Sequence, residues 1–356
     1  MKPDRVPRRN PLSADLDWVL ARLERPLSAL RGRRIFITGG TGFIGTWLLE
    51  CLAWANQHLD LGVSALILSR NPDSFLERKP HLALNPGFKF HQGDVQHFDF
   101  PSGRFSQVLH LAATPAEATF RNVEPLAKLD LQERGMRRTL DFALHCGAEQ
   151  VFFASSGCVY GTQPWSLTHI PEDFPGAPDP LEPAQALGHG KRMAEFLGSA
   201  YAAKHGLEVK IARGFSFVGP GLQMDLQYAI GNFILNVLRG ENIQVRGDGT
   251  QRRSYLYAAD LLVWLWTIFL EGRSCRPYNV GSELDLSIKE LAETVARTLG
   301  AKGSVEIAGF PQPGQPSDRY VPCTLRARSE LGLEEYTDLS IAIVRTAEYC
   351  AQSGRF

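Results

Sequence analysis

A glycine-rich loop between a predicted strand and a predicted helix constrains the fold of this chain more than any other feature. The apolar segment Arg34–Thr38 leads into the loop, and Phe43–Asn56 then shows helical periodicity. Glycines at this spacing allow a tight turn, let the backbone approach a pyrophosphate and let the helix pack close to the strand. Amides at the start of the helix are donors for phosphates. We therefore expect a dinucleotide to bind at Gly39, Thr41, Gly42, Phe43, Ile44 and Gly45.

Short apolar runs alternate with longer stretches of helical periodicity from Arg33 onward. The predicted strands are Arg34–Thr38, Ala65–Ser69, Phe88–Gln92, Val108–Leu111, Val151–Ser155 and Val209–Arg213. The predicted helices between them are Phe43–Asn56, Glu124–Cys146 and Ala186–His205. This order predicts an α/β fold with a doubly wound parallel Rossmann sheet, in which ligands bind outside the carboxyl ends of the strands.

The same pattern divides the chain into three parts. Residues 1–32 are predicted to form an N-terminal arm and a short helix, Ala14–Leu23, with Ser13 as its N-cap. Residues 33–215 are the predicted dinucleotide-binding domain, which residues 257–271 are expected to rejoin. From about Gly214 the elements become shorter and are separated by Gly and Pro. Residues 216–356 are therefore predicted to form a smaller, mixed α/β substrate-binding domain, interleaved with the first.

Charge and cysteine content narrow the function classes. Lys plus Arg and Asp plus Glu both number 38, so no net field favours nucleic acid or an anionic membrane. The six cysteines show no C-x-x-C spacing, which predicts a cytoplasmic protein without a structural metal site. The longest apolar stretches, such as Leu261–Leu270, are too short to span a bilayer. We expect neither a nucleic-acid nor a membrane partner.

The second predicted strand bears on the choice of cofactor. A carboxylate at its end would bond the adenosine ribose, whereas a cation accommodates a 2'-phosphate. The strand ends in Ser69-Arg70 without an acid, so we expect NAD(P) with a preference for NADP, and NAD stays open. Asp94 and Val95 follow the third strand, where Asp94 either contacts the adenine or caps a turn.

Three further segments carry a resemblance to a known family. They are His110-Leu111-Ala112-Ala113, Ser155-Ser156-Gly157-Cys158-Val159-Tyr160-Gly161 and Gly247-Asp248-Gly249-Thr250-Gln251-Arg252-Arg253-Ser254. Together with the glycine loop, the chain from Arg33 to Glu348 resembles the nucleotide-sugar epimerase and dehydratase branch of the extended short-chain dehydrogenases/reductases. The resemblance implies that Leu111, Ala112, Ala113 and Lys191 also bind the NAD(P). It also implies a homodimer formed through Glu124–Cys146 and Ala186–His205.

The catalytic pattern of that family is altered in this chain. Its members use a Ser or Thr together with a Tyr and a Lys in a Y-x-x-x-K motif; by resemblance, Ser156 and Lys191 match the first and the last. Leu187 occupies the Tyr position, and leucine has no proton to exchange. Loss of a positioned acid–base group costs on the order of 10²- to 10⁴-fold in rate. His189 points away from the face that Leu187 and Lys191 share, so we expect a surface histidine.

Cys158 and Tyr160 are the remaining catalytic candidates beside Ser156 and Lys191. Cys158 stands where dehydratases of the family carry a glutamate, and the loop resembles that of GDP-mannose 3,5-epimerases, whose cysteine exchanges a proton at carbon. A thiolate near a cation can do this, but a free cysteine is also often a buried apolar residue. Tyr160 is common in the family's loop, and its structural and catalytic interpretations both stay open.

The resemblance also implies a site for a nucleoside-diphosphate sugar. Guanidinium groups bind diphosphates through paired hydrogen bonds, which fits Arg253 and Arg319, and Asn232 adds an amide. Ser156 is expected to contact the sugar, and Arg252 is expected to face solvent.

The sequence thus favours an NAD(P)-dependent nucleotide-sugar epimerase, or a related sugar-modifying enzyme, that acts through a keto or enolate intermediate. The alternatives are an NADPH-dependent keto-sugar reductase or dehydratase, and an impaired family member that only binds cofactor and nucleotide sugar. The nucleobase, the sugar and the reacting carbon stay open.

Overall fold

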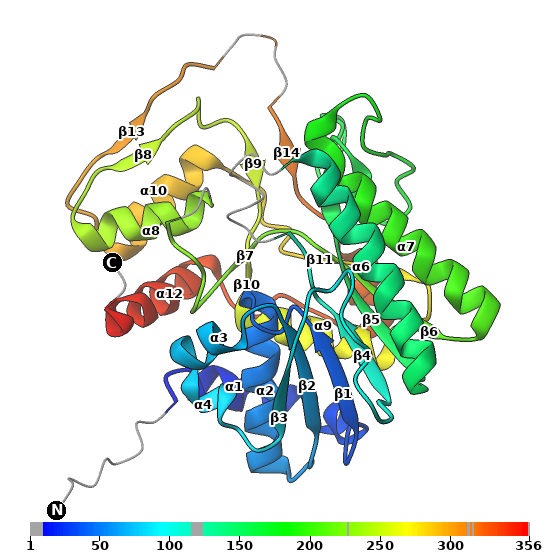
Figure 1. Cartoon of the computed structure of the whole chain (residues 1–356). Coiled ribbons are helices and arrows are strands. Elements are labelled where there is room, and N and C mark those ends of the chain that lie inside the picture. Colours follow the sequence, from blue (N-terminus) through cyan, green and yellow to red (C-terminus); the bar gives the residue numbers. More distant parts are fainter. Residues whose placement is uncertain (1–9, 115–123, 226–227, 312–313, 315–316, 355–356) are drawn as a thin grey trace, which may run out of the picture.

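The computed structural model describes residues 10–114, 124–225, 228–311, 314 and 317–354. Within them, seven parallel strands form one sheet in the order β11-β6-β5-β4-β1-β2-β3 (Figure 1). The strands are β1 (Arg34–Thr38), β2 (Ser64–Ser69), β3 (Phe88–Gln92), β4 (Gln107–His110), β5 (Gln150–Ser156), β6 (Glu208–Gly214) and β11 (Pro277–Val280). The doubly wound α/β fold is confirmed, and each strand expected from the sequence is present.

Helices cover both faces of this sheet. One face carries α6 (Pro125–Cys146) and α7 (Ala186–His205); the other carries α1 (Ser13–Ser28), α2 (Phe43–Leu59) and α9 (Ala258–Glu271). Neighbouring side chains of a strand point to opposite faces. Phe36 therefore joins the core under α6, whereas Ile35 and Ile37 join the core under α1, α2 and α9. Burial on both faces explains why the strands are almost continuously apolar.

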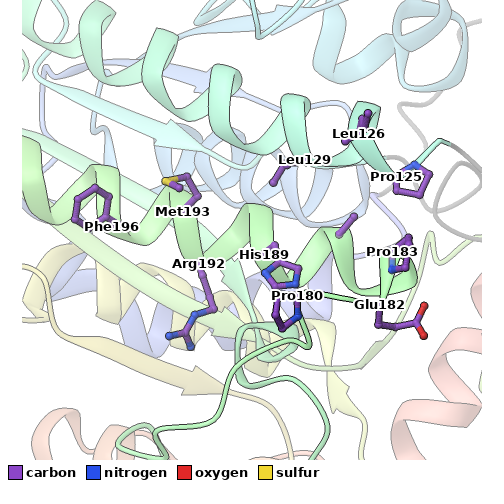
Figure 2. A pocket seen from close by; sticks show the side chains of 11 residues that line it. Pro125, Leu126, Leu129, Pro180, Glu182, Pro183, His189, Arg192, Met193 and Phe196 are labelled. Atoms are coloured by element: carbon purple, nitrogen blue, oxygen red, sulfur yellow. The ribbon is translucent and has the colours of Figure 1, made fainter.

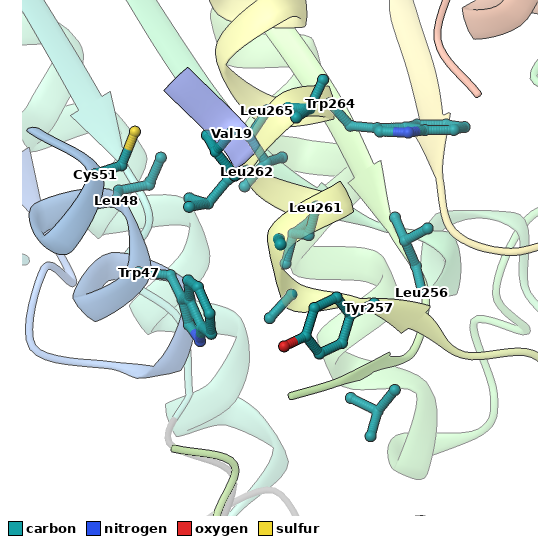
Figure 3. Close-up of a cluster of buried hydrophobic side chains, with 14 of the residues drawn as sticks. Val19, Trp47, Leu48, Cys51, Leu256, Tyr257, Leu261, Leu262, Trp264 and Leu265 are labelled. Atoms are coloured by element: carbon teal, nitrogen blue, oxygen red, sulfur yellow. The ribbon is translucent and has the colours of Figure 1, made fainter. Parts of the chain in front are cut away.

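The N-terminal helix α1 belongs to this core. It is longer than predicted, and its buried Val19 packs with side chains of α2 and α9 (Figure 3). Ser13 is not the N-cap, because it is the first helical residue and Leu12 precedes it without a side-chain cap. The Asn10 side chain instead accepts a hydrogen bond from the Leu12 amide. Residues 1–9 of the predicted arm lie outside the described part of the chain.

The elements after β6 partly complete the main sheet and partly form a second lobe, made of α8 (Ala229–Arg239), α10 (Ile288–Leu299), α12 (Leu339–Ser353) and the short strands around them. These helices pack together, with α8 and α10 beside the pair β8 (Ile243–Val245) and β13 (Val305–Ile307). A three-stranded sheet has the order β12 (Leu286–Ser287), β9 (Arg252–Arg253), β14 (Arg319–Tyr320). A further pair joins β7 (Phe217–Val218) to β10 (Leu256–Tyr257). The elements α9 and β11 follow the predicted boundary at residue 216 but contact β6 of the main sheet. The two predicted domains are therefore interleaved in the sequence.

Short helices complete the described elements: α3 (Pro72–Arg78), α4 (Pro80–Ala83), α11 (Leu325–Leu331) and the 3-10 turns η1 (Gly157–Tyr160) and η2 (Pro183–Gln185). None of the helices in the described ranges is long and apolar enough to cross a bilayer. Among the described side chains, no group of three His, Cys, Asp or Glu residues is arranged to hold a metal ion.

Candidate functional site

The glycine loop closes over the end of β4. Gly39 has a positive φ of +70°, and a Cβ there would lie 2.6 Å from the Ala112 nitrogen and the Leu111 carbonyl carbon. A Cβ on Gly45 would overlap the Gly39 carbonyl oxygen and lie 2.5 Å from the Gly40 Cα. Both glycines are therefore required by the protein's own packing, Gly39 against the segment after β4 and Gly45 within the loop, because backbone atoms cannot move aside.

Gly42 differs from these two glycines. Its φ is −81°, and the nearest atom to an added Cβ is the Gly39 carbonyl oxygen at 3.5 Å, which is ordinary contact. Gly42 is the N-cap of α2 and provides no side-chain cap, and the first amides of a helix have no partner within the helix. The protein's own packing does not call for a glycine here, but a pyrophosphate resting on the helix N-terminus does. The loop fits a dinucleotide.

Other predicted cofactor residues lie at neighbouring strand ends. Arg70 is exposed after β2, and the buried Ser69 accepts a backbone hydrogen bond from Gly93 at 3.0 Å. The Asp94 carboxylate accepts from the Gln96 amide at 2.9 Å, so it caps a turn in this structure. Val95 is buried in the core and packs against Gly135 of α6. Contacts of these residues with a cofactor stay predictions.

Ser156 ends β5 and opens the 3-10 turn η1. Its Oγ accepts a hydrogen bond from the Cys158 amide at 3.3 Å and lies 3.2 Å from the Tyr320 Oη. The Tyr320 hydroxyl also donates to the Gly214 carbonyl oxygen at 3.3 Å. Sequence reasoning missed Tyr320, because 164 positions separate it from Ser156. Its only sequence signal was its place beside Arg319.

Lys191 lies on α7 and is buried beneath the same loop. Its Nζ donates to the Ala154 carbonyl oxygen at 2.7 Å and stands 4.8 Å from the centre of the Phe153 ring. Burial lowers the pKa of Lys191 to about 8, with opposing influence from Cys158 and Glu195. The Lys191 side chain therefore lies close to the end of β5 and to Cys158, and its catalytic role stays a prediction.

Cys158 and Tyr160 have different surroundings. Burial raises the pKa of the Cys158 thiol, although a hydrogen bond with Ser156 and the Lys191 charge oppose the rise. Cys158 is thus a protonated thiol at neutral pH in this structure. The buried Tyr160 donates to Asn279 Oδ1 at 2.7 Å and accepts from Arg213 Nη1 at 2.9 Å. These bonds favour a structural role for Tyr160.

Leu187 lies on α7, where this helix meets the turn η1. The helix packs directly on η1 there, since a Cβ on Gly188 would lie 2.5 Å from the Cys158 carbonyl oxygen. His189 has Nε2 3.0 Å from the Asp179 carbonyl oxygen and lines an apolar hollow on the outer surface (Figure 2). It therefore faces the outer surface of α7.

The predicted diphosphate ligands come together only in part. In the parallel pair β9–β14, Arg253 lies opposite Tyr320 and Arg252 opposite Arg319. Arg253 forms an ion pair with Asp318 at 2.6 Å, and Arg319 approaches Asp285 at 3.4 Å. The expectation that Arg252 faces solvent was wrong: its side chain is 27% exposed and pairs with Asp285 at 2.7 Å. An incoming diphosphate would thus compete with two carboxylates.

Asn232, the third predicted diphosphate ligand, lies on α8. Its amide nitrogen donates to the Tyr228 carbonyl oxygen at 3.1 Å. A contact between Asn232 and a diphosphate stays a prediction.

His110 is buried behind the glycine loop. Its Nδ1 lies 3.0 Å from the hydroxyl oxygens of both Thr38 and Thr139. Burial, and secondarily the Lys191 charge, lower the pKa of His110 to about 3. The unfolded chain takes up this proton near pH 6.5, long before the folded protein does. His110 is therefore neutral in the folded protein at physiological pH.

We expect acid to destabilise the protein through His110. Its contribution is complete above about pH 6.5 and is lost as pH falls towards about 3, at up to about 1.4 kcal/mol per pH unit. Urea unfolding across this window should show a weaker loss of stability in His110→Gln than in the wild type. Equal slopes would contradict the assignment.

The fold and the glycine loop together define a Rossmann-type dinucleotide-binding protein. A family model described as the NAD-dependent epimerase/dehydratase family matches residues 35–281. The chain belongs to the NAD-dependent epimerase/dehydratase family.

Known proteins show what this chain is similar to. UDP-glucuronic acid decarboxylase 6 of Arabidopsis thaliana is 32% identical over 303 residues, which cover 85% of this chain and 84% of that protein. The solved UDP-glucose 4-epimerase of Thermotoga maritima has a TM-score of 0.73 at 21% identity, covering 90% of this chain and all of its own. The dTDP-glucose 4,6-dehydratase of Streptomyces venezuelae, solved with NAD bound, has a TM-score of 0.74 at 23% identity, covering 90% and 97%.

Proposed function

We propose that this protein is a nicotinamide-dependent enzyme that modifies a nucleoside-diphosphate sugar through a keto intermediate, as an epimerase or a decarboxylase does. The observation that carries the proposal is the 3.2 Å contact between Ser156 and Tyr320. Through this contact the paired strands β9 and β14, which carry Arg253 and Arg319, lie against the end of β5. The strand β1, which leads into the glycine loop, belongs to the same sheet as β5. This arrangement supports the proposal that the cofactor loop, the reacting serine and the phosphate ligands serve one site.

Each group has a distinct task in this proposal. A bound nicotinamide would supply the hydride transfer from and to a sugar carbon. The helix α2 N-terminus and Gly42 hold the pyrophosphate of the dinucleotide. Ser156 hydrogen-bonds the reacting sugar oxygen, and the Lys191 ammonium stabilises negative charge that develops beside it. Arg253 and Arg319 bind the diphosphate of the sugar nucleotide.

The names of the relatives point to a uridine nucleotide. The curated relatives carry the name UDP-glucuronic acid decarboxylase, and a neighbouring structure contains UDP-glucose. We therefore infer a UDP-sugar. Oxidation at C4 of a UDP-hexuronic acid would create a β-keto acid, which loses CO₂ without further help from an acidic side chain. This suits a loop with Cys158 in place of a carboxylate.

The test is turnover of UDP-glucuronic acid, UDP-glucose and dTDP-glucose, supplied with NAD or NADP, with products followed by mass spectrometry in deuterated water. Ser156→Ala should lower turnover on the order of 10²-fold or more. Cys158→Ser should leave solvent-deuterium incorporation unchanged, because burial raises the pKa of the thiol and leaves little thiolate to take a proton from carbon. A wild type inactive on all three sugars would refute the proposal.

A keto-sugar reductase with dissociable NADPH is the second candidate, and the exposed Arg70 after β2 favours it. Stoichiometric consumption of NADPH would distinguish a reductase from an enzyme that recycles its cofactor.

The Arg70 guanidinium is expected to set the preference for NADP over NAD. Arg70→Asp should weaken NADPH binding about 10- to 100-fold, because a charged hydrogen bond to a 2'-phosphate contributes about 1.5–3 kcal/mol. NADH binding should change little. Calorimetry with both coenzymes measures this, and Arg78→Asp, on nearby α3, is the charge-matched control. An unchanged NADPH affinity would remove Arg70 from the cofactor site.

We also propose that the protein is a homodimer through α6 and α7. The outer surfaces of these helices carry exposed apolar side chains around a hollow, among them Leu126 and Phe196, each 65% exposed, and Met193 (Figure 2). An apolar patch of this kind marks an interaction surface, and the family resemblance supplies the occupant, a second copy.

Phe196→Glu is expected to produce a monomer, because a carboxylate in the centre of an apolar interface is desolvated without a partner. Sedimentation equilibrium measures the change. Leu84→Glu, which replaces another exposed apolar side chain outside this surface, should stay dimeric. A monomeric wild type would contradict the dimer.

A further inference from the structure

A phenol from the second lobe lies at the serine of the catalytic loop. Tyr320 belongs to β14, and its Oη is 3.2 Å from the Ser156 Oγ and 3.3 Å from the Gly214 carbonyl oxygen. Ser156 itself stands at the carboxyl end of β5, where ligands of a doubly wound sheet bind. The Tyr320 hydroxyl therefore has a local acceptor and a direct contact with the residue that is expected to touch the sugar.

The absence of a side chain at Gly157 leaves space for the Tyr320 hydroxyl. The Tyr320 ring packs on Phe215 with ring centres 4.6 Å apart. A Cβ on Gly157 would lie 2.8 Å from the Tyr320 Oη and 2.6 Å from the Phe215 ring. A side chain at position 157 would displace the hydroxyl from Ser156, so Gly157 serves the placement of Tyr320.

Among the described residues, the other candidates near Ser156 are less suited to proton transfer at the sugar oxygen. Leu187 offers no proton, and the Tyr160 hydroxyl is engaged by Asn279 and Arg213. The Cys158 sulfur belongs to the same neighbourhood, but burial raises the pKa of this thiol. Burial likewise raises the pKa of Tyr320, so both groups carry their protons at neutral pH. What sets Tyr320 apart is its position, with Oη 3.2 Å from the Ser156 Oγ.

We propose that Tyr320 is the acid–base residue of this enzyme and performs from the second lobe the proton transfer that Leu187 cannot perform. The inference rests on the proposed nucleotide-sugar function. During reduction of a keto sugar, a bound reduced nicotinamide would supply the hydride for the new C–H bond, and Tyr320 donates its Oη–H proton to the sugar oxygen to form the new O–H bond. The resulting tyrosinate is reprotonated by water. In the oxidative direction the Tyr320 phenol first loses its proton to water, and the tyrosinate oxygen then accepts the sugar hydroxyl proton.

The test compares Tyr320→Phe with the wild type, using UDP-glucuronic acid and UDP-glucose with NAD as substrates and UDP as a binding probe. We expect turnover to fall on the order of 10²- to 10⁴-fold while the UDP affinity measured by calorimetry is kept. Adding Leu187→Tyr to the Tyr320→Phe protein should restore part of the turnover. When 3-fluorotyrosine, a more acidic phenol, replaces Tyr320 in the otherwise unchanged protein, the increase of oxidative turnover with pH should occur at lower pH.

Tyr255→Phe is the matched control, because this buried tyrosine lies in the same lobe and is not a hydrogen-bond partner of Ser156. Its turnover should equal that of the wild type. If Tyr320→Phe keeps wild-type turnover, or loses UDP affinity in proportion to turnover, Tyr320 is not the acid–base residue. A wild type that converts none of UDP-glucuronic acid, UDP-glucose and dTDP-glucose overturns the proposed function and this inference together.

Discussion

Alanine at Gly42 is expected to weaken binding of NAD(H) and NADP(H) by about 100-fold or more while the protein stays folded. The added Cβ meets the chain's own atoms only at ordinary contact, 3.5 Å from the Gly39 carbonyl oxygen. It would occupy the space in which a pyrophosphate approaches the α2 amides. Losing two charged hydrogen bonds at about 1.5–3 kcal/mol each accounts for the size of the effect.

Gly45→Ala provides the comparison. Its Cβ would lie 2.5 Å from the Gly40 Cα and overlap the Gly39 carbonyl oxygen, so the loop itself must distort. We expect Gly45→Ala to lower the melting temperature and to lose the cofactor, whereas Gly42→Ala loses only the cofactor. Circular dichroism and coenzyme calorimetry separate the two variants. Full coenzyme affinity in Gly42→Ala would show that no phosphate rests on this turn.

Removing Arg213 is expected to destabilise the protein by about 3–5 kcal/mol, because it leaves the Glu195 carboxylate buried without its cation. The two side chains are each 13% exposed and pair at 2.6 Å. The same pair positions the catalytic loop, since Arg213 donates to Tyr160 and Glu195 accepts from Ser155. Turnover should therefore fall along with stability.

Urea unfolding of Arg213→Met, Glu195→Met and the double variant measures this effect. We expect the double variant to lose less free energy of unfolding than the two single variants lose together, because it leaves no buried charge without a partner. Arg137→Met on α6 is the control: its ion pair with Glu133 is solvent-exposed, and such pairs contribute about 0.5 kcal/mol or less. Similar losses at Arg213 and Arg137 would show that the buried pair has no special weight.

Much of the fold could be predicted because its signals are local. The strands β1, β2, β4 and β5 contain short apolar runs, and burial on both faces keeps such a run apolar. The strand β11 was missed, since Pro277–Val280 is short and its place in the sheet depends on pairing with β6, far away in the sequence. The Ser13 cap was assigned incorrectly because the Asn10 side chain bonds the Leu12 amide ahead of the helix.

The candidate site divides in the same way. Gly39 and Gly45 could be recognised within seven residues, because the positive φ of Gly39 and the start of the helix at Gly45 belong to one local turn. The atoms that crowd Gly39, in Leu111 and Ala112, come from the distant end of β4. The ion pair of Arg252 with Asp285 could not be recognised, because 33 residues separate the partners and only β9–β12 pairing joins them.

The sequence alone determined the class of this protein: a strand, a glycine loop and a helix are contiguous, so the dinucleotide turn follows from neighbouring residues. The tertiary structure decided which side chains surround the reacting serine. Tyr320 reaches Ser156 across 164 positions, through strand pairing in the second lobe and packing on Phe215. Contacts over such a separation depend on how whole elements pack, and no local pattern in the sequence records that packing.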